Sequence, residues 1–373
     1  EDGVLVAPAP YSAPSAYYFP TVGRMHTIEV RKGSSSIEQG PYTTGGVLNL
    51  ISTPVPGGLA GKVEGFAGEY GVLNLHAHVG DTVGQWGYLL ETYQFETDGF
   101  KDLDGGGSTG FDQRDYLGKL RWNSRASADV YHAVELKLGY VEHFANETYL
   151  GLTQEDFDVT PFRRYAASQE DDLDTEHEQY QLSWLVIPRD ELSVTTTAYR
   201  NDFFRNWHKL QSVDGVGLGS VLEDPDTFAA ELEILRGQTD SDPGSLRIRN
   251  NRRDYFAEGV QSVLDWSLGG ERTSHELRIG FRYHRDEEDR FQEEDSYRMV
   301  DGFMELTAFG APGSQANRVS SAEALAFFVS DTIGVGRWTF SPGVRHESID
   351  FERVDYASDD PDREGDARVR LND

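Results

Sequence analysis

The sequence predicts an all-β membrane protein: a transmembrane antiparallel β-barrel, with about eleven strands present, preceded by a small glycine-rich domain. Three observations predict this class. Apolar and polar residues alternate with a period of two in many segments from residue 60 onward. Short and long connections between those segments take turns. Aromatic residues make up 12% of the chain and gather toward the ends of the segments.

The alternation identifies the strands, because successive side chains of a strand face opposite sides of the sheet. It is clearest where Leu277, Ile279, Phe281 and Tyr283 share one face while arginine and glycine occupy the other. The same pattern predicts strands at approximately 61–70, 73–82, 86–97, 112–124, 130–145, 175–187, 192–207, 252–268, 275–290, 319–333 and 337–352.

The connections favour a membrane barrel over a soluble β-sandwich, which would show the same alternation. Tight links such as 83–85 take turns with long ones over residues 98–111, 146–174, 208–251 and 291–318. Turns at one rim and long loops at the other are typical of outer-membrane barrels. Trp86, Trp122 and Trp266 near strand ends fit an aromatic girdle at the lipid interface. The soluble alternative predicts that the chain purifies without detergent.

Composition excludes several classes of protein. A net charge of −30 argues against binding nucleic acid through its phosphates. The absence of cysteine excludes disulfides and thiolate metal sites. No run of about 18 apolar residues predicts a transmembrane helix. No nucleophile elbow, phosphate-binding loop or His-Glu-x-x-His motif occurs, so we expect neither an enzyme nor a resident cofactor.

The first 57 residues have a different character from the rest. Two short strand signals, at 27–30 and 47–51, flank a run rich in glycine and hydroxyl residues. Glycine permits positive φ and close approach of backbones. Gly33, Gly40, Gly45 and Gly46 therefore suit a compact globule wedged inside a lumen.

This stretch resembles a known family. "IEVRKG" at 28–33, a Gln-Gly turn at 39–40 and "GGVLNL" at 45–50, followed by barrel strands, resemble the end of the plug domain of TonB-dependent outer-membrane receptors. Further segments, "EDGVLVAPAPYS", "FPTVGRMHTIEV", "RYAASQ" and "WTFSPGVRHESI", look like the ferric dicitrate receptor branch. The resemblance implies that residues 1–57 are the C-terminal part of the plug. It also implies that residues 58–373 are the first half of a barrel of twenty-two strands, so we expect a fragment.

The resemblance also implies a function. Such receptors import a ferric chelate, here ferric citrate or a related carboxylate siderophore, across the outer membrane of a Gram-negative bacterium. The TonB energy-coupling protein drives transport, and a monomeric barrel contacts lipid and lipopolysaccharide. The same machine could carry haem, another siderophore, a nickel chelate, cobalamin or an oligosaccharide. A haem cargo predicts an outer-loop histidine, for which His143, His177 and His208 are the candidates.

Candidate ligand residues follow from the charge of the cargo. Ferric citrate is an anion rich in carboxylates, and guanidinium groups bind carboxylates bidentately. Arginines gather at residues 247–253. By resemblance, Arg249, Arg253 and Arg318 fall near the family's ligand arginines, and the plug candidates are Lys32, Ser15 and Gln39. The alternative is that the arginines only pair with neighbouring carboxylates or lipopolysaccharide phosphates.

Two other patterns contain residue types that bind metal ions. His76 and His78 share one face of a predicted strand, but no third ligand is indicated, so we expect an incidental pair and no metal site. The acidic runs 170–174, 286–289 and 293–295 lack the spacing of a calcium loop. We expect them to form a solvated rim that keeps the loops extended by repulsion and that divalent cations can bridge to lipid phosphates.

Overall fold

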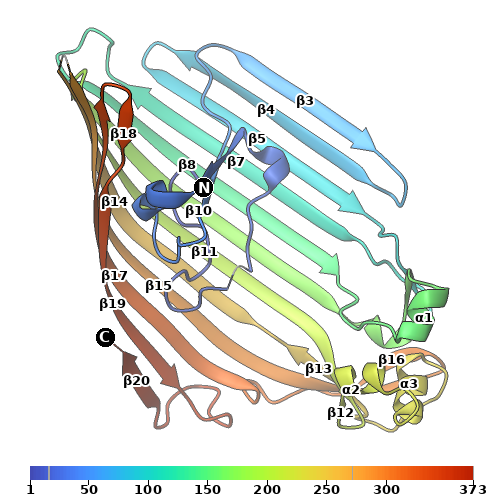
Figure 1. The fold of residues 1–373 in the computed structure, drawn as a ribbon. Helices are drawn as coiled ribbons and strands as arrows, with labels where there is room; N and C mark the ends of the chain where they lie inside the picture. Colours follow the sequence, from blue (N-terminus) through green and yellow to red (C-terminus); the bar gives the residue numbers. More distant parts are fainter. Residues whose placement is uncertain (16, 271, 373) are drawn as a thin grey trace.

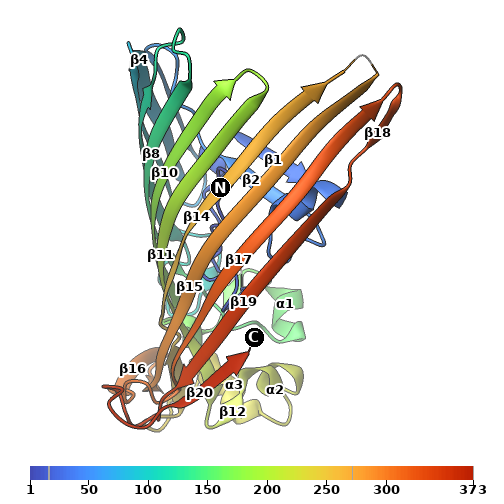
Figure 2. The ribbon, with the colours of Figure 1, turned by 90° about the vertical axis from the view of Figure 1, so that its left-hand side faces the viewer.

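A large antiparallel sheet curves into half a cylinder, and the N-terminal segment lies in its hollow (Figures 1 and 2). We use the word plug for residues 1–57 as a label taken from the resemblance, and the word wall for the sheet. The computed structural model describes residues 1–15, 17–270 and 272–372. Within them, the sheet runs in one path from β3 to β20 through neighbouring antiparallel strands. The predicted all-β barrel wall is confirmed.

The predicted strands are all found. The long strands of the wall are β3 (Ala60–Ala67), β4 (Leu73–Val83), β5 (Trp86–Thr97), β7 (Phe111–Asn123), β8 (Tyr131–Asn146), β10 (Asp172–Arg189), β11 (Leu192–Val213), β14 (Arg253–Gly269), β15 (Thr273–Val300), β17 (Ala316–Val335) and β19 (Gly343–Asp355). Shorter members are β12 (Val216–Gly217), β13 (Leu246–Asn250), β16 (Phe303–Ala308), β18 (Trp338–Phe340) and β20 (Arg368–Asn372). The predictions end too early in β11 and β15 because these strands continue into segments that pack against the long connections, where the alternation is lost. Strand β20 was not predicted, although Val369 and Leu371 alternate with polar residues in it.

The wall has two chemically different faces. Along β17, Ala322, Ala324 and Ala326 are buried on the inner face, while Leu325 and Phe327 are half exposed on the outer face. Small inner side chains let the plug approach the wall, and Tyr11 packs against Ala322 and Ala324. The exposed outer side chains are those that a lipid-facing surface requires.

The plug segment forms its own small sheet. Its strands β1 (Thr27–Arg31) and β2 (Val47–Ile51) are antiparallel, as the two strand signals predicted. Two short 3-10 helices accompany them, η1 (Val22–Arg24) and η2 (Gly33–Glu38).

The structure explains why three of the four plug glycines have no side chain. Gly33 and Gly46 have φ values of 73° and 123°, and a Cβ at Gly46 would lie 2.8 Å from the carbonyl oxygen of Arg31. A Cβ at Gly40 would overlap the side chains of Arg345 and Glu347. Gly45 lies in open space, so nothing in the structure requires glycine there.

The long connections fold into one packed body at the end of the sheet that carries α1, α2 and α3 (Figure 1). This loop body contains α1 (Gln154–Val159), η3 (Ala166–Ser168), α2 (Leu218–Glu223), α3 (Ala229–Leu235) and β16, with a small parallel sheet of β6 (Asp102–Leu103) and β9 (Arg163–Arg164) beside it. Its buried core includes Tyr165, Leu210, Leu235, Ile248 and Met299. Among the described residues, no helix has the length and apolar character needed to cross a membrane.

The expectation of solvated acidic runs that extend the loops is wrong for four residues, since Asp171, Asp286, Glu288 and Asp295 are buried. Asp171 is buried and accepts hydrogen bonds from the backbone N–H groups of Leu210 (2.8 Å) and Leu150 (3.4 Å). Asp286 is buried on the inner face and accepts bonds from the N–H groups of Tyr11 (2.7 Å) and Ser12 (2.9 Å). Both carboxylates satisfy backbone donors that would otherwise be orphaned. Asp171 thereby joins two loops to each other, and Asp286 joins the plug to the wall.

Asp171 should make the loop body sensitive to pH. Burial raises its pKa to about 6, against the opposing effect of the hydrogen bonds it accepts. Because the folded state holds the proton more tightly than the unfolded state, stability is greatest at low pH and falls as pH rises from about 4 to about 6. Asp171→Asn removes the charge and keeps one acceptor oxygen, at the cost of the acceptor that faces the other backbone N–H. That cost does not depend on pH, whereas the cost of the buried charge does. We therefore expect the free energy of unfolding of the variant relative to wild type to rise by about 2–3 kcal/mol between pH 4 and neutral pH.

Hydrogen exchange at the amides of Leu150 and Leu210, measured in both proteins at both pH values, checks this expectation. Asp174→Asn is the matched control, because Asp174 belongs to the same acidic run but is exposed. A difference between wild type and Asp171→Asn that is the same at both pH values would contradict the prediction.

Candidate functional site

Four arginines on four neighbouring strands lie directly opposite one another on the inner face of the wall. The pairing register joins Arg205 of β11 to Arg253 of β14, Arg253 to Arg290 of β15, and Arg290 to Arg318 of β17. Residues opposite each other in antiparallel strands project to the same face. Arg205 and Arg253 are 2% and 7% exposed. We call these four residues the arginine row.

The arginine row carries more positive charge than its surroundings neutralise. Glu288 of β15 pairs with Arg253 (2.8 Å) and with Arg290 (3.1 Å). Among the described residues, it is the only carboxylate that forms an ion pair with any member of the row. Like charges opposite each other on adjacent strands destabilise a sheet. The row therefore weakens the wall in the absence of an anion.

The row also has hydrogen-bond donors to spare. The Nη1 atom of Arg205 and the Nε atoms of Arg253, Arg290 and Arg318 are buried without a hydrogen-bond partner. Each buried unsatisfied donor is costly, and a guanidinium group presents its donors in a planar fork that fits a carboxylate. This donor set matches a ligand with several carboxylate groups.

The plug supplies an aromatic surface beneath the row. The ring of Tyr17 lies 3.8 Å from the guanidinium carbon of Arg205 and 5.1 Å from that of Arg253. Burial alone would raise the pKa of Tyr17, but Arg253 and Arg205 outweigh it and lower the pKa. The Tyr255 hydroxyl accepts from Arg205 (3.5 Å) and Arg253 (3.4 Å). The site is therefore a cluster of positive charge where the plug contacts the wall.

Two of the three arginines named from the sequence, Arg253 and Arg318, belong to the row. Arg249 does not: it lies on β13, where its Nη2 atom bonds Glu294 and Gln315 at 2.9 Å each. Glu294 is four residues beyond Arg290 along β15, which corresponds to about 14 Å. The alternative of simple pairing with a neighbouring carboxylate thus describes Arg249.

Of the three plug candidates, Ser15 lies close in the chain to Tyr17, whereas Lys32 and Gln39 lie elsewhere. Ser15 is exposed, two residues before Tyr17, and its N–H donates to the carbonyl of Ala13 (2.7 Å). Lys32 and Gln39 flank η2, whose last residue, Glu38, pairs with Arg278 at 2.6 Å. Arg278 lies twelve residues before Arg290 on β15, about 40 Å along the strand. Lys32 and Gln39 are therefore not brought together with the arginine row.

The sequence analysis missed Arg205, Arg290 and Tyr17. Arg205 continues the period-two pattern of Tyr199, Asn201 and Phe203 and could have been placed on the inner face from it. The alignment of four arginines could not be predicted, because it depends on the register between strands that are far apart in sequence.

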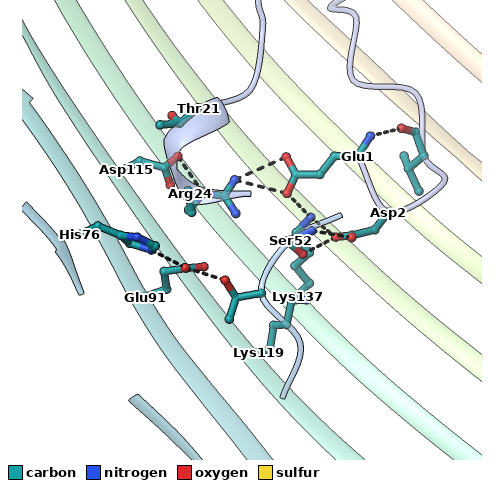
Figure 3. A network of polar contacts seen from close by, with 12 residues as sticks. Glu1, Asp2, Thr21, Arg24, Ser52, His76, Glu91, Asp115, Lys119 and Lys137 are labelled. Atoms are coloured by element: carbon teal, nitrogen blue, oxygen red, sulfur yellow. Dashed lines mark hydrogen bonds and ion pairs between the residues drawn. The ribbon is translucent and has the colours of Figure 1, made fainter. Parts of the chain in front are cut away.

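A second polar network fixes the plug to the wall (Figure 3). Arg24 of η1 donates to Asp115 of β7 (2.9 Å) and to Glu1 (3.3 Å). Lys137 of β8 contacts Glu1 (2.5 Å) and Asp2 (2.6 Å). The side chains of Arg24, Asp115, Glu1 and Lys137 are at most 3% exposed. These buried charges have lost their contact with water, and each is stabilised by the opposite charges beside it. Each charge therefore depends on its partners.

The three histidines considered for haem are not in outer loops. His143, His177 and His208 lie on β8, β10 and β11. His177 is buried, and its ring stacks on Tyr18 of the plug at 4.0 Å. None of the three candidates for a haem cargo therefore lies in a loop.

Comparison with known proteins relates the fold to others of the same architecture. A family model described as "TonB dependent receptor-like, beta-barrel" matches residues 82–369. Three solved structures share the fold: the ferric citrate transporter FecA in its unliganded form (19% identity, TM-score 0.72, covering 99% of this chain and 49% of that chain), the siderophore receptor PiuA from Acinetobacter baumannii (13%, 0.67, 94% and 50%) and the ferric-catecholate import receptor Fiu from E. coli K12 (12%, 0.62, 90% and 47%). The chain spans about half the length of each.

Proposed function

This chain belongs to the TonB-dependent receptor family, and from that premise we propose that its receptor imports an anionic ferric chelate bearing carboxylates, of which ferric citrate is the model. The chelate binds at the arginine row, beside Tyr17. The TonB energy-coupling protein then displaces the plug, and the chelate passes into the periplasm. The receptor acts as a monomeric barrel in the outer membrane of a Gram-negative bacterium, with lipid and lipopolysaccharide around its outer face.

The arginine row is the single observation that carries this proposal. Four guanidinium groups with one shared carboxylate leave a local excess of positive charge within a chain of net charge −30. The fold maintains this excess although it destabilises the sheet, as expected where an anion is to be bound. A carboxylate chelate accepts the unused donors and neutralises the charge. A neutral chelate would do neither.

Haem import is less well supported than it was from the sequence. A histidine that coordinates haem iron must be accessible to the haem. His177 is buried beneath Tyr18. Its ring therefore serves the contact between plug and wall.

Transport in this proposal requires no bond-making chemistry and no resident cofactor. The network around Arg24 and Lys137 holds the plug in the lumen at rest. Because every charge in the network has a partner, the closed state is stable without energy input. Opening must separate these pairs, and the work of doing so comes from the coupling protein.

Ligand binding to the full-length receptor in detergent tests the proposal. Quenching of tryptophan fluorescence should reveal tight binding of ferric citrate and no comparable binding of an uncharged ferric hydroxamate or of haem. Affinity should fall as ionic strength rises, although less steeply than for exposed charges because the site is enclosed. Preference for the uncharged chelate, or no binding of any carboxylate chelate, would refute it.

A further inference from the structure

His76 and His78 are joined by a third potential metal ligand from the next strand. Glu91 of β5 lies directly opposite His78 of β4 in the pairing register. His76 Nε2 is 2.8 Å from Glu91 Oε1, and His78 Nδ1 is 3.9 Å from the same atom. The expectation that no third ligand accompanies the histidine pair is wrong.

The three groups lie close enough together to bind one metal ion. One ligand atom from each of the three residues lies within 4.8 Å of the others. Tetrahedral zinc with bonds of about 2.0–2.2 Å requires ligand atoms roughly 3.4 Å apart. The distances of 2.8 and 3.9 Å lie on either side of that value, so shifts of well under 1 Å would complete the geometry.

Burial provides an independent reason to expect a ligand. The Glu91 side chain is fully buried, yet its Oε2 atom has no hydrogen-bond partner. The Nδ1 atom of His78 is also buried without a partner. An orphaned carboxylate oxygen and an orphaned imidazole nitrogen beside each other are both electron-pair donors, and a cation satisfies both.

The surroundings orient the carboxylate. Thr53, in the segment that leads from the plug into the wall, donates its hydroxyl to Glu91 Oε1 at 2.7 Å (Figure 3 shows Glu91 and His76). Glu64 of β3 is the register partner of His76, on the same face, where it pairs with Lys62 at 2.6 Å. Water can take the fourth position of the ion.

We propose that His76, His78 and Glu91 form a binding site for a divalent transition-metal ion of borderline softness, such as Zn²⁺. Two imidazoles and one carboxylate suit zinc, nickel, cobalt or copper better than calcium or magnesium. The site lies at the inner face of the wall, where the plug segment crosses it, and is separate from the arginine row. Thr53 acts as a positioning residue that couples the metal site to the plug.

Metal binding to the full-length receptor tests the proposal. The receptor is first stripped with a chelator and then titrated with ZnCl₂, and bound metal is counted by elemental analysis. We expect one zinc ion per receptor. Bound Co²⁺ should show the intense visible absorption of tetrahedral coordination rather than the weak bands of the hydrated ion.

The decisive variant is His78→Gln, because it leaves the bond between His76 and Glu91 intact and should fold normally. It should abolish stoichiometric binding, as should Glu91→Gln. Thr53→Val should weaken the affinity by about 10–100-fold without removing the site. His346→Gln, on an exposed residue of β19, is the matched control and should bind like wild type. Unchanged zinc stoichiometry in His78→Gln, or no stoichiometric zinc in the wild type, would overturn the proposal.

Discussion

Replacement of Arg205 and Arg253 together by alanine is expected to weaken binding of the anionic ferric chelate by about 10²–10⁴-fold. Each substitution removes a charged hydrogen bond to the chelate, and such bonds contribute about 1.5–3 kcal/mol each. The effect on the empty receptor has two opposing parts. Loss of two opposed cations relieves repulsion within the sheet, and Glu288 keeps its pair with Arg290. Two buried side chains and the pair between Arg253 and Glu288 are lost, so thermal stability without ligand should fall moderately.

Fluorescence titration and calorimetric unfolding of the same preparations measure both effects. Arg200→Ala is the matched control, because Arg200 lies on β11 like Arg205 but is exposed and paired with Asp202 and Glu258. Its chelate affinity should equal that of wild type. A double variant that is less stable and still binds normally would identify the arginine row as a purely structural feature.

Lys137→Met is expected to lower the free energy needed to release the plug from the wall by about 3–5 kcal/mol. Methionine preserves the length of the side chain, so the main loss is the ammonium group that lies between Glu1 and Asp2. Arg24 still contacts Glu1, whereas Asp2 keeps only its bonds to Ser52 among the contacts described here. Removing one partner from a buried ion pair is strongly destabilising because the other charge remains out of water.

The unfolding of the plug can be followed independently of the wall. The chain contains no cysteine, so a single spin label at Thr44→Cys, on an exposed turn of the plug, reports urea-induced release. The urea midpoint should fall in Lys137→Met and should stay near the wild-type value in Arg114→Met, whose salt bridges to Asp112 and Glu142 are exposed. Equal midpoints in the two variants would show that the network does not hold the plug.

The wall was predictable because it obeys a single local rule. Lipid outside and plug inside impose a period of two on each strand, and segments such as 277–283 carry that period in their own residues. The rule fails where β11 and β15 pack against the loop body, as Leu210 and Met299 do, so these parts of the two strands were missed. The loop body was missed as well, because its core joins Tyr165, Leu235 and Met299 from separate connections.

The candidate sites were less predictable, for a related reason. Arg253 and Arg318 were named, but nothing local to either residue indicates that Arg290 lies between them. The same holds for Glu91, which is 15 residues from His76 in sequence and bonds to it. Sites of this kind depend on register between strands, which no single segment specifies.

Iron itself provides the most direct measurement of where the cargo binds. Crystals of the full-length receptor grown with ferric citrate, with diffraction recorded at the iron absorption edge, would locate the metal without reference to the surrounding side chains. We predict one anomalous peak in the lumen, between Tyr17 and the guanidinium groups of Arg205, Arg253, Arg290 and Arg318. A peak beside Arg249 and Glu294, or one confined to the loop body, would contradict the assignment of the arginine row as the binding site.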